Sequence, residues 1–193
     1  SMVPATASLQ QLLSALRPGG VPAVQRLQLD DCDVGPAALA HCTQLASVTW
    51  ICLGGCEAAA AGGWEAALAA VLRHAPRLSS LLIENSLFGK LPQCLILHTG
   101  LRRLGLWGNG LQVLPAGPYL ASLEQLVLWE DALLQLPASL AAATALTALE
   151  VQRHPDSPPL SAVGLGAVLA SLPRLQLLVL MHCGLQHLPL DSW

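Results

Sequence analysis

The sequence predicts an α/β solenoid, in which short parallel strands stack side by side and a turn or a helix follows each strand. The first observation is a frame of eleven residues, clearest from Leu101 to Leu111, with leucine at its first, fourth, sixth and eleventh positions and asparagine at its ninth. The second observation is that this frame recurs along most of the chain, and repeats of about 20 to 50 residues are typical of solenoids.

Seven copies of the frame follow one another. Most successive starts are 21 to 29 residues apart, and the 33 residues after the second copy imply an insertion. The second copy is the least regular: it has Leu53 at its ninth position and turns Ile51 away from the core. The copies begin at Val24, Leu45, Leu78, Leu101, Leu123, Leu146 and Leu175. Besides Asn109, the ninth position holds Cys32, Ser86, Asp131, His154 and Cys183.

The Leu-x-Leu centre of each copy predicts a short strand with two different faces. Side chains alternate along a strand, so the leucines point into the core and the residues between them point out. The ninth residue is expected to turn inward and bond backbone groups of the turn, since unpaired polar groups are costly when buried. His154 is assigned this structural role.

The frame resembles that of the leucine-rich-repeat family over nearly the whole chain. Within this family, a Leu-x-x-Leu-Pro run after the strand is similar to the plant and algal type. It spans Leu111 to Pro115, Leu133 to Pro137 and Leu185 to Pro189, and in altered form Phe88 to Pro92. The longer second and sixth repeats resemble the ribonuclease-inhibitor type. The resemblance implies a right-handed horseshoe with a concave parallel sheet of about seven strands and helices or irregular turns on the convex side.

The 193 residues are expected to form one domain. Residues 1–23 would hold a capping helix, residues 24–190 the seven repeats, and residues 191–193 a truncated end. Helices are predicted at Trp64 to His74, with Trp64 as a core anchor, and at Ala162 to Leu172. Because no closing cap follows the last repeat, we expect Leu178 and Leu180 to be poorly covered, and the natural chain to continue or a partner to cover this end.

Composition excludes several classes of function. Apolar residues make up 53% of the chain and charged residues 11%, which is far from disorder. No apolar run of about 18 residues predicts a membrane span. The net charge is −3 and Lys90 is the single lysine, so the basic stripe that nucleic-acid binding requires is missing.

The six cysteines favour an intracellular, cytoplasmic location. Cys32 and Cys183 lie at opposite ends of the repeat array and cannot pair with each other. Secreted members of the resembled family usually carry cysteine-rich caps, and none is visible. Free thiols suit a reducing compartment, so all six cysteines are expected to be free.

No residue pattern predicts catalysis, a cofactor or a metal site. Nucleophile elbows, phosphate loops and zinc-protease motifs are missing. His182, Cys183 and His187 lie close together in sequence, but the repeat already explains Cys183, and structural zinc normally requires four ligands. Cys52 and Cys56 form an equally weak pattern. The chain is therefore predicted not to be an enzyme.

The candidate binding residues are those that the repeat itself does not require. Trp107 and Trp129 occupy equivalent places in adjacent strands, and Gly105 and Gly108 leave space beside Trp107. An apolar surface with aromatic anchors and a polar rim is typical of protein-binding sites. Alternatively, the two rings pave the sheet or meet a C-terminal extension. The candidates are Arg103, Trp107, Val127, Trp129, Glu130, Glu150, Arg153, Val179, Met181 and His182, with Glu84 as a further rim residue.

The sequence therefore predicts a non-catalytic module that binds a protein or peptide on its concave face, with no nucleic acid and no membrane as partner. A second hypothesis is the recognition arm of a larger protein. F-box-type ubiquitin-ligase subunits and nucleotide-binding immune receptors use similar repeats, and further domains of the same chain would then lie beyond the C-terminal end.

Overall fold

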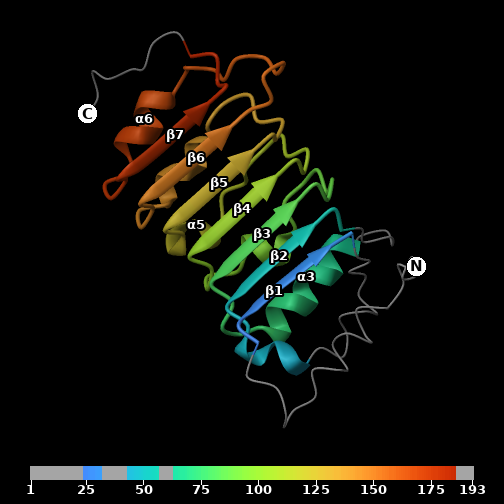
Figure 1. The fold of residues 1–193 in the computed structure, drawn as a ribbon. Coiled ribbons are helices and arrows are strands. Elements are labelled where there is room, and N and C mark those ends of the chain that lie inside the picture. Colours follow the sequence, from blue (N-terminus) through green and yellow to red (C-terminus); the bar gives the residue numbers. More distant parts are fainter. Residues whose placement is uncertain (1–23, 32–42, 57–62, 186–193) are drawn as a thin grey trace.

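The computed structural model describes residues 24–31, 43–56 and 63–185, and contains one sheet of seven parallel strands. The strands pair in the order of the sequence, from β1 to β7 (Figure 1). This arrangement confirms the predicted leucine-rich-repeat type of solenoid. The strands are β1 (Arg26–Asp30), β2 (Trp50–Gly54), β3 (Ser80–Glu84), β4 (Arg103–Trp107), β5 (Gln125–Trp129), β6 (Ala148–Gln152) and β7 (Leu177–Met181).

The strand register agrees with the predicted frame in six of the seven copies. In β4 and β5, Leu104 pairs with Leu126 and Leu106 pairs with Leu128. All four side chains are buried. The fourth and sixth positions of the frame therefore line the core, and the third, fifth and seventh positions form the opposite, concave face.

The second copy of the frame begins at Val48 and not at Leu45, so its predicted register was wrong by three residues. Ile51 pairs with Leu27 of β1 and with Leu81 of β3, which places it in the core. The error has a simple cause. Leu45 lies in the 3-10 turn η1 (Thr43–Ser47) and is also buried, so both possible starting positions carry an apolar core residue.

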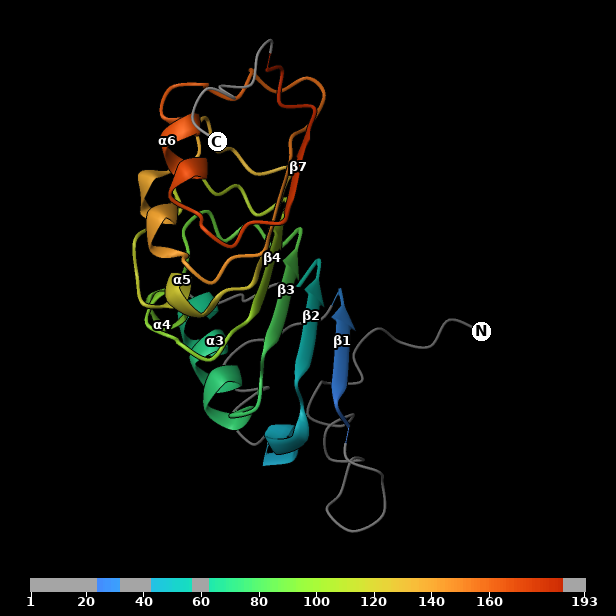
Figure 2. The ribbon, with the colours of Figure 1, turned by 90° about the vertical axis from the view of Figure 1, so that its left-hand side faces the viewer.

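The described helices and 3-10 turns lie on the side of the sheet away from the concave face (Figure 2). The longest, α3 (Gly63–His74), confirms the predicted helix. Its Trp64 is half-buried against the core, with its ring 5.7 Å from that of Phe88. The other elements are short: α4 (Gln93–Ile96), α5 (Tyr119–Ser122), η2 (Ala138–Ala142) and α6 (Leu165–Ala170).

Helix α6 begins later than predicted, because Gly164 in front of it has a left-handed backbone with φ of 76°. The inward residues of the predicted helix are nevertheless correct, since Leu165, Val168, Leu169 and Leu172 are all buried. The predicted capping helix lies outside the described residues, as do Cys32, Cys42, His187 and the chain after residue 185.

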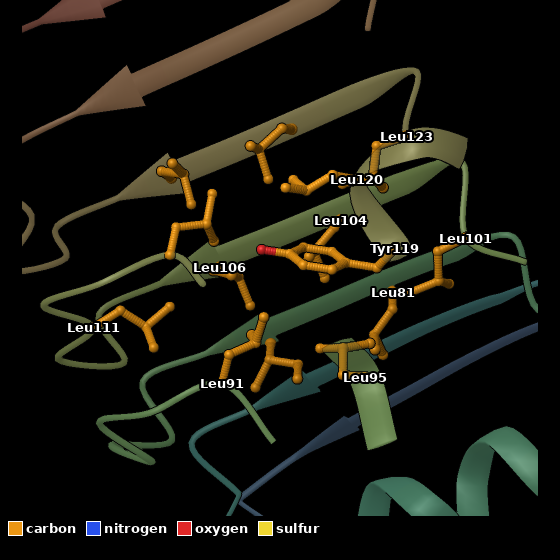
Figure 3. Close-up of a cluster of buried hydrophobic side chains, with 14 of the residues drawn as sticks. Leu81, Leu91, Leu95, Leu101, Leu104, Leu106, Leu111, Tyr119, Leu120 and Leu123 are labelled. Atoms are coloured by element: carbon orange, nitrogen blue, oxygen red, sulfur yellow. The ribbon is translucent and has the colours of Figure 1, made fainter. Parts of the chain in front are cut away.

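Leucines from the strands and from the turns fill the space between the sheet and the convex elements. Figure 3 shows this cluster, in which Tyr119 of α5 extends among the leucines of β3 to β5. Tyr119 is fully buried, and its hydroxyl donates a hydrogen bond to the Pro115 carbonyl at 2.8 Å. The leucines before the prolines of the Leu-Pro turns, Leu91, Leu114 and Leu136, are buried as well.

Several ninth-position side chains tie their repeat to the one before it. The Asn109 amide donates to the Ile83 carbonyl at 2.8 Å and accepts the backbone N–H of Ser86 at 3.1 Å. Cys56 and Cys183 use their thiols in the same way, at 3.4 Å to the Leu29 carbonyl and 3.7 Å to the Val151 carbonyl. Cys56 therefore takes the structural place that the predicted frame had given to Leu53.

The sixth repeat departs from this pattern, and two predictions fail there. Arg153, expected at the rim of the concave face, turns inward and is only 3% exposed, with its guanidinium donating to the Leu133 carbonyl. His154, expected inward, is exposed and its ring accepts the backbone N–H of Asp156 at 3.3 Å. The eighth residue has thus replaced the ninth, because the long aliphatic stem of an arginine can be buried while its head group reaches a carbonyl.

The last described strand is less covered than the inner ones. Leu178 and Leu180 of β7 are half-buried, whereas their partners Leu149 and Val151 of β6 are buried. This agrees with the expected poor cover of the two leucines.

Candidate binding surface on the concave face

Two tryptophans at the centre of the concave face contact each other. Trp107 ends β4 and Trp129 ends β5, and the two residues are register partners. Their rings meet edge to face, with centroids 5.0 Å apart and planes inclined by 73°. Both side chains remain partly exposed, since no described helix covers this face. The predicted equivalence of the two residues in adjacent strands is confirmed, and the contact between their rings also fits the alternative that they pave the sheet.

A hollow of about 120 Å³ lies beside the two rings. Its floor is at Gly105, where the strand carries no side chain; a Cβ atom there would come within 3.1 Å of Leu82 Cγ. Of the two glycines predicted to leave space beside Trp107, Gly105 lines the hollow, whereas Gly108 lies against the Asn85 side chain. Roughly 10–15 Å³ is enough for one water molecule, so the hollow admits a larger group. It is lined by Leu82, Glu84, Arg103, Gly105, Leu106, Trp107, Val127, Trp129 and Glu150.

The hollow combines apolar walls with charged side chains. Glu84 lies beside Trp107 in the register, and Glu150 lies beside Val127. Within the described part of the chain the ion pairs are Arg102 with Glu124 and His154 with Asp156. Arg103 therefore lines the same hollow as both glutamates without forming an ion pair with either.

The described thiols are structural groups. Burial, followed by the charges of Glu84 and Asp30, raises the pKa of Cys52 to about 11. Its thiol lies 3.9 Å from Glu84 Oε1 as a weak donor. Burial also raises the pKa of Cys94 to about 12, with Glu65 as the next cause. Because the thiolate is the reactive form, neither cysteine is suited to act as a nucleophile near neutral pH.

The structure brings together five of the ten predicted site residues around the hollow: Arg103, Trp107, Val127, Trp129 and Glu150. Glu130 is exposed in the turn after β5, where its φ is 53°. Val179 and Met181 lie on β7, one strand beyond β6, and pair with Glu150 and Gln152. His182 is exposed after β7 and borders a separate hollow with Leu178 and Leu180. Arg153 is the one predicted site residue that lies in the core.

Sequence reasoning missed a third tryptophan on this face. The corrected register places Trp50 at the third position of its repeat, where it is partly exposed. The Arg26 guanidinium lies over the Trp50 ring, 5.6 Å from its centroid. Reading Cys56 as a ninth-position residue, equivalent to Cys183, would have given the right register from the sequence.

Within the described parts of the chain, no three histidine, cysteine, aspartate or glutamate side chains gather closely enough to hold a metal ion. Each helix that the structure describes is too short or too polar to cross a lipid bilayer. Compared with known proteins, the chain matches no family model and no curated protein.

Proposed function

We propose that this chain is a leucine-rich-repeat protein of mixed plant-type and ribonuclease-inhibitor-like repeats that binds a protein or peptide on its concave face. The binding surface runs from the fourth to the seventh repeat, and the module itself catalyses no reaction. An intracellular location is part of the proposal and is supported by the free thiols of Cys52, Cys94 and Cys183.

The observation that carries this proposal is the partly exposed Trp107–Trp129 pair beside the hollow. Large aromatic side chains left in contact with water give up hydrophobic stabilisation that a partner can recover. Energetically dominant residues of protein interfaces are enriched in tryptophan and cluster in pockets near the centre of the interface. The frame requires Leu106 and Leu128 for the core but makes no demand for tryptophan beside them.

Quantitative affinity capture from lysate of the source cells tests the proposal. The bait is the wild-type chain, and the test bait carries Trp107→Ala together with Trp129→Ala. Truncation of a true anchor typically costs about 2 kcal/mol or more, roughly thirtyfold in affinity. Specific partners of the wild type should therefore be depleted from the double variant, while circular dichroism shows an unchanged fold.

A matched control removes exposed apolar side chains elsewhere. Val113 and Leu134 lie in the turns that follow β4 and β5, and are 65% and 60% exposed. The Val113→Ala, Leu134→Ala double variant should keep the partners. Partners that survive the loss of both tryptophans but are lost with the control variant would place the binding surface on the turns and contradict the proposal.

A further inference from the structure

The hollow beside the tryptophan pair contains two carboxylates that the described chain leaves without an ionic partner. Glu84 comes from β3 and Glu150 from β6, and β4 and β5 supply the rings between them. The Cys52 thiol is a weak donor to Glu84, and a neutral thiol does not offset its charge. The hollow as a whole therefore carries two negative charges and the one positive charge of Arg103.

The charges of the surrounding concave face have the same sign. On the described strands and the residues directly after them, the charged side chains of this face are five acidic and two basic. Arg153 does not count toward this balance because it is buried. An acidic surface attracts basic partners and repels acidic ones at long range. The acidic residues are Asp30, Asp31, Glu84, Glu130 and Glu150, and the basic ones are Arg26 and Arg103.

Aromatic rings and carboxylates together are complementary to an organic cation. The face of a tryptophan ring attracts ammonium and guanidinium groups, and the chain already shows this preference where Arg26 lies over Trp50. Carboxylates form charge-assisted hydrogen bonds with the same groups. An apolar side chain would fill the hollow but leave Glu84 and Glu150 partly desolvated without compensation. An acidic side chain would find one cation, Arg103, and would be repelled by both Glu84 and Glu150.

We propose that the hollow formed by Glu84, Trp107, Trp129 and Glu150 over Gly105 binds a lysine or arginine side chain of a basic peptide segment. This inference rests on the proposed function and specifies its partner. The tryptophan pair supplies apolar contact and cation–π attraction, and the glutamates supply the ionic contacts. The extended segment lies across the concave face from β3 to β7, so it covers the proposed surface and also reaches Glu84; one cationic residue is inserted in the hollow and its neighbours lie toward the acidic rim.

A peptide library displayed on phage provides the probe. Selection is made on the wild-type chain, and the recovered peptides are then tested for binding to the Trp107→Ala, Trp129→Ala variant. The recovered sequences should be enriched in one arginine or lysine at a fixed position. A synthetic peptide of the selected sequence is then compared by calorimetry with a copy in which that residue is citrulline or acetyl-lysine. Loss of the charge should weaken binding about tenfold or more, the effect expected for one charge-assisted contact.

Charge-neutral variants of the chain test the other half of the contact. Glu84→Gln and Glu150→Gln should each lower the affinity for the cationic peptide by roughly tenfold at low salt, and by less at high salt. The Glu84→Gln side chain would still offer an oxygen to the Cys52 thiol, so the fold is preserved. Glu124→Gln is the matched control: it removes one negative charge paired with Arg102, away from the hollow, and should leave the affinity unchanged.

The outcomes separate this inference from the proposed function. If the selected peptides need both tryptophans but bind equally well with citrulline or acetyl-lysine, the cation assignment is wrong and the concave binding surface stands. If the peptides bind the tryptophan double variant as strongly as the wild type, both are wrong. Enrichment of neutral or acidic residues at the fixed position, or a library without binders, also overturns the cation assignment.

Discussion

The carboxylate of Asp131 accepts the backbone N–H of Asn109 at 3.0 Å, so the ninth residues of two neighbouring repeats are bonded directly to each other. The same oxygen, Oδ1, also accepts the N–H of Leu111 at 3.1 Å. The other oxygen, Oδ2, is buried without a hydrogen-bond partner. In the preceding repeat, Asn109 has an amide nitrogen, Nδ2, in place of this oxygen, and it donates to the Ile83 carbonyl. Asp131 therefore has an acceptor where its equivalent has a donor.

We predict that Asp131→Asn stabilises the protein at neutral pH. The new amide would donate to the Leu106 carbonyl, as Asn109 does to Ile83, while its oxygen keeps both backbone N–H groups. Removing a buried unsatisfied group is worth about 1–3 kcal/mol. Urea unfolding at pH 7 measures the change in the free energy of unfolding. A lower stability of the variant would contradict this account of the site.

The stabilisation by Asp131→Asn should depend on pH. Burial raises the pKa of Asp131 from 3.8 to about 6, against the lowering effect of hydrogen bonds from the backbone of Leu111, Asn109 and Gly110. Between these two values the folded state binds more protons than the unfolded state, so this group's contribution to stability falls as pH rises. It is fully present below about pH 4 and lost above about pH 6.

Urea unfolding of the wild type and of Asp131→Asn between pH 4 and pH 7 measures this dependence. The advantage of the variant should grow across that range, by at most about 3 kcal/mol. Glu130→Gln, which removes the exposed neighbouring carboxylate, serves as the control for general charge effects. A constant difference between wild type and Asp131→Asn would show that the pKa of Asp131 is not raised.

The two faces of β4 should respond differently to truncation. Leu106 is fully buried, so Leu106→Ala is expected to lower the free energy of unfolding by about 2–5 kcal/mol. Trp107 is partly exposed and its ring contacts that of Trp129, so Trp107→Ala should cost about 0.5–1.5 kcal/mol from the lost ring contact, plus a modest contribution from the lost apolar burial. Chemical unfolding measures both. Tryptophan variants that unfold first would mean that the rings are buried.

All six cysteines should titrate as free thiols in denaturant without reductant. Cys52, Cys94 and Cys183 are free thiols in the structure, and the prediction extends to Cys32, Cys42 and Cys56. A count of four or fewer would contradict the intracellular location.

In the folded protein, Cys94 should react with iodoacetamide at least tenfold more slowly than glutathione at pH 8. The reason is that its pKa is raised to about 12, so little thiolate is present. Peptide mapping by mass spectrometry follows the modification. A rate that levels off between pH 8 and pH 9 would show an ordinary thiol.

Leu87→Gly should stabilise the protein by up to about 1 kcal/mol. Leu87 has a φ of 47° and a side chain that is 79% exposed, so it is strained and contributes little packing. The equivalent residues of the fourth and seventh repeats are Gly110 and Gly184, which adopt this conformation without the steric cost. Thermal unfolding compares the variant with Val113→Gly, which removes another exposed apolar side chain from a turn and should destabilise.

The strands were predictable from sequence because the frame specifies them redundantly. Where Leu104, Leu106 and Asn109 occur at fixed intervals, a shift of register would bury polar groups and expose leucine. This redundancy failed in the second repeat, where Leu45 and Val48 are both apolar and three residues apart. The residue that separates the two registers is Cys56, which lies at the ninth position only when the repeat begins at Val48.

The candidate site was predictable in part for the same reason. Alternation along the strands placed Trp107, Trp129 and Glu150 correctly on one face. Arg153 could not be placed, because its direction is decided by the turn after β6 and not by the strand. Its backbone N–H still donates to the Met181 carbonyl at 3.0 Å, as in the other repeats, but the side chain turns the other way. The pattern of residue types does not indicate which way the backbone of this turn directs the Arg153 side chain.

The hollow lies inside the stack, with β1 and β2 before its first wall and β7 after its last. Because each repeat contacts only its neighbours, disturbances that begin at either end of the array are absorbed before they reach β4 and β5. Whole repeats could be gained or lost at either end of the array while β3 to β6, the four strands that line the hollow, stayed in place. The residues that line the hollow and the number of repeats in the array can therefore change independently of each other.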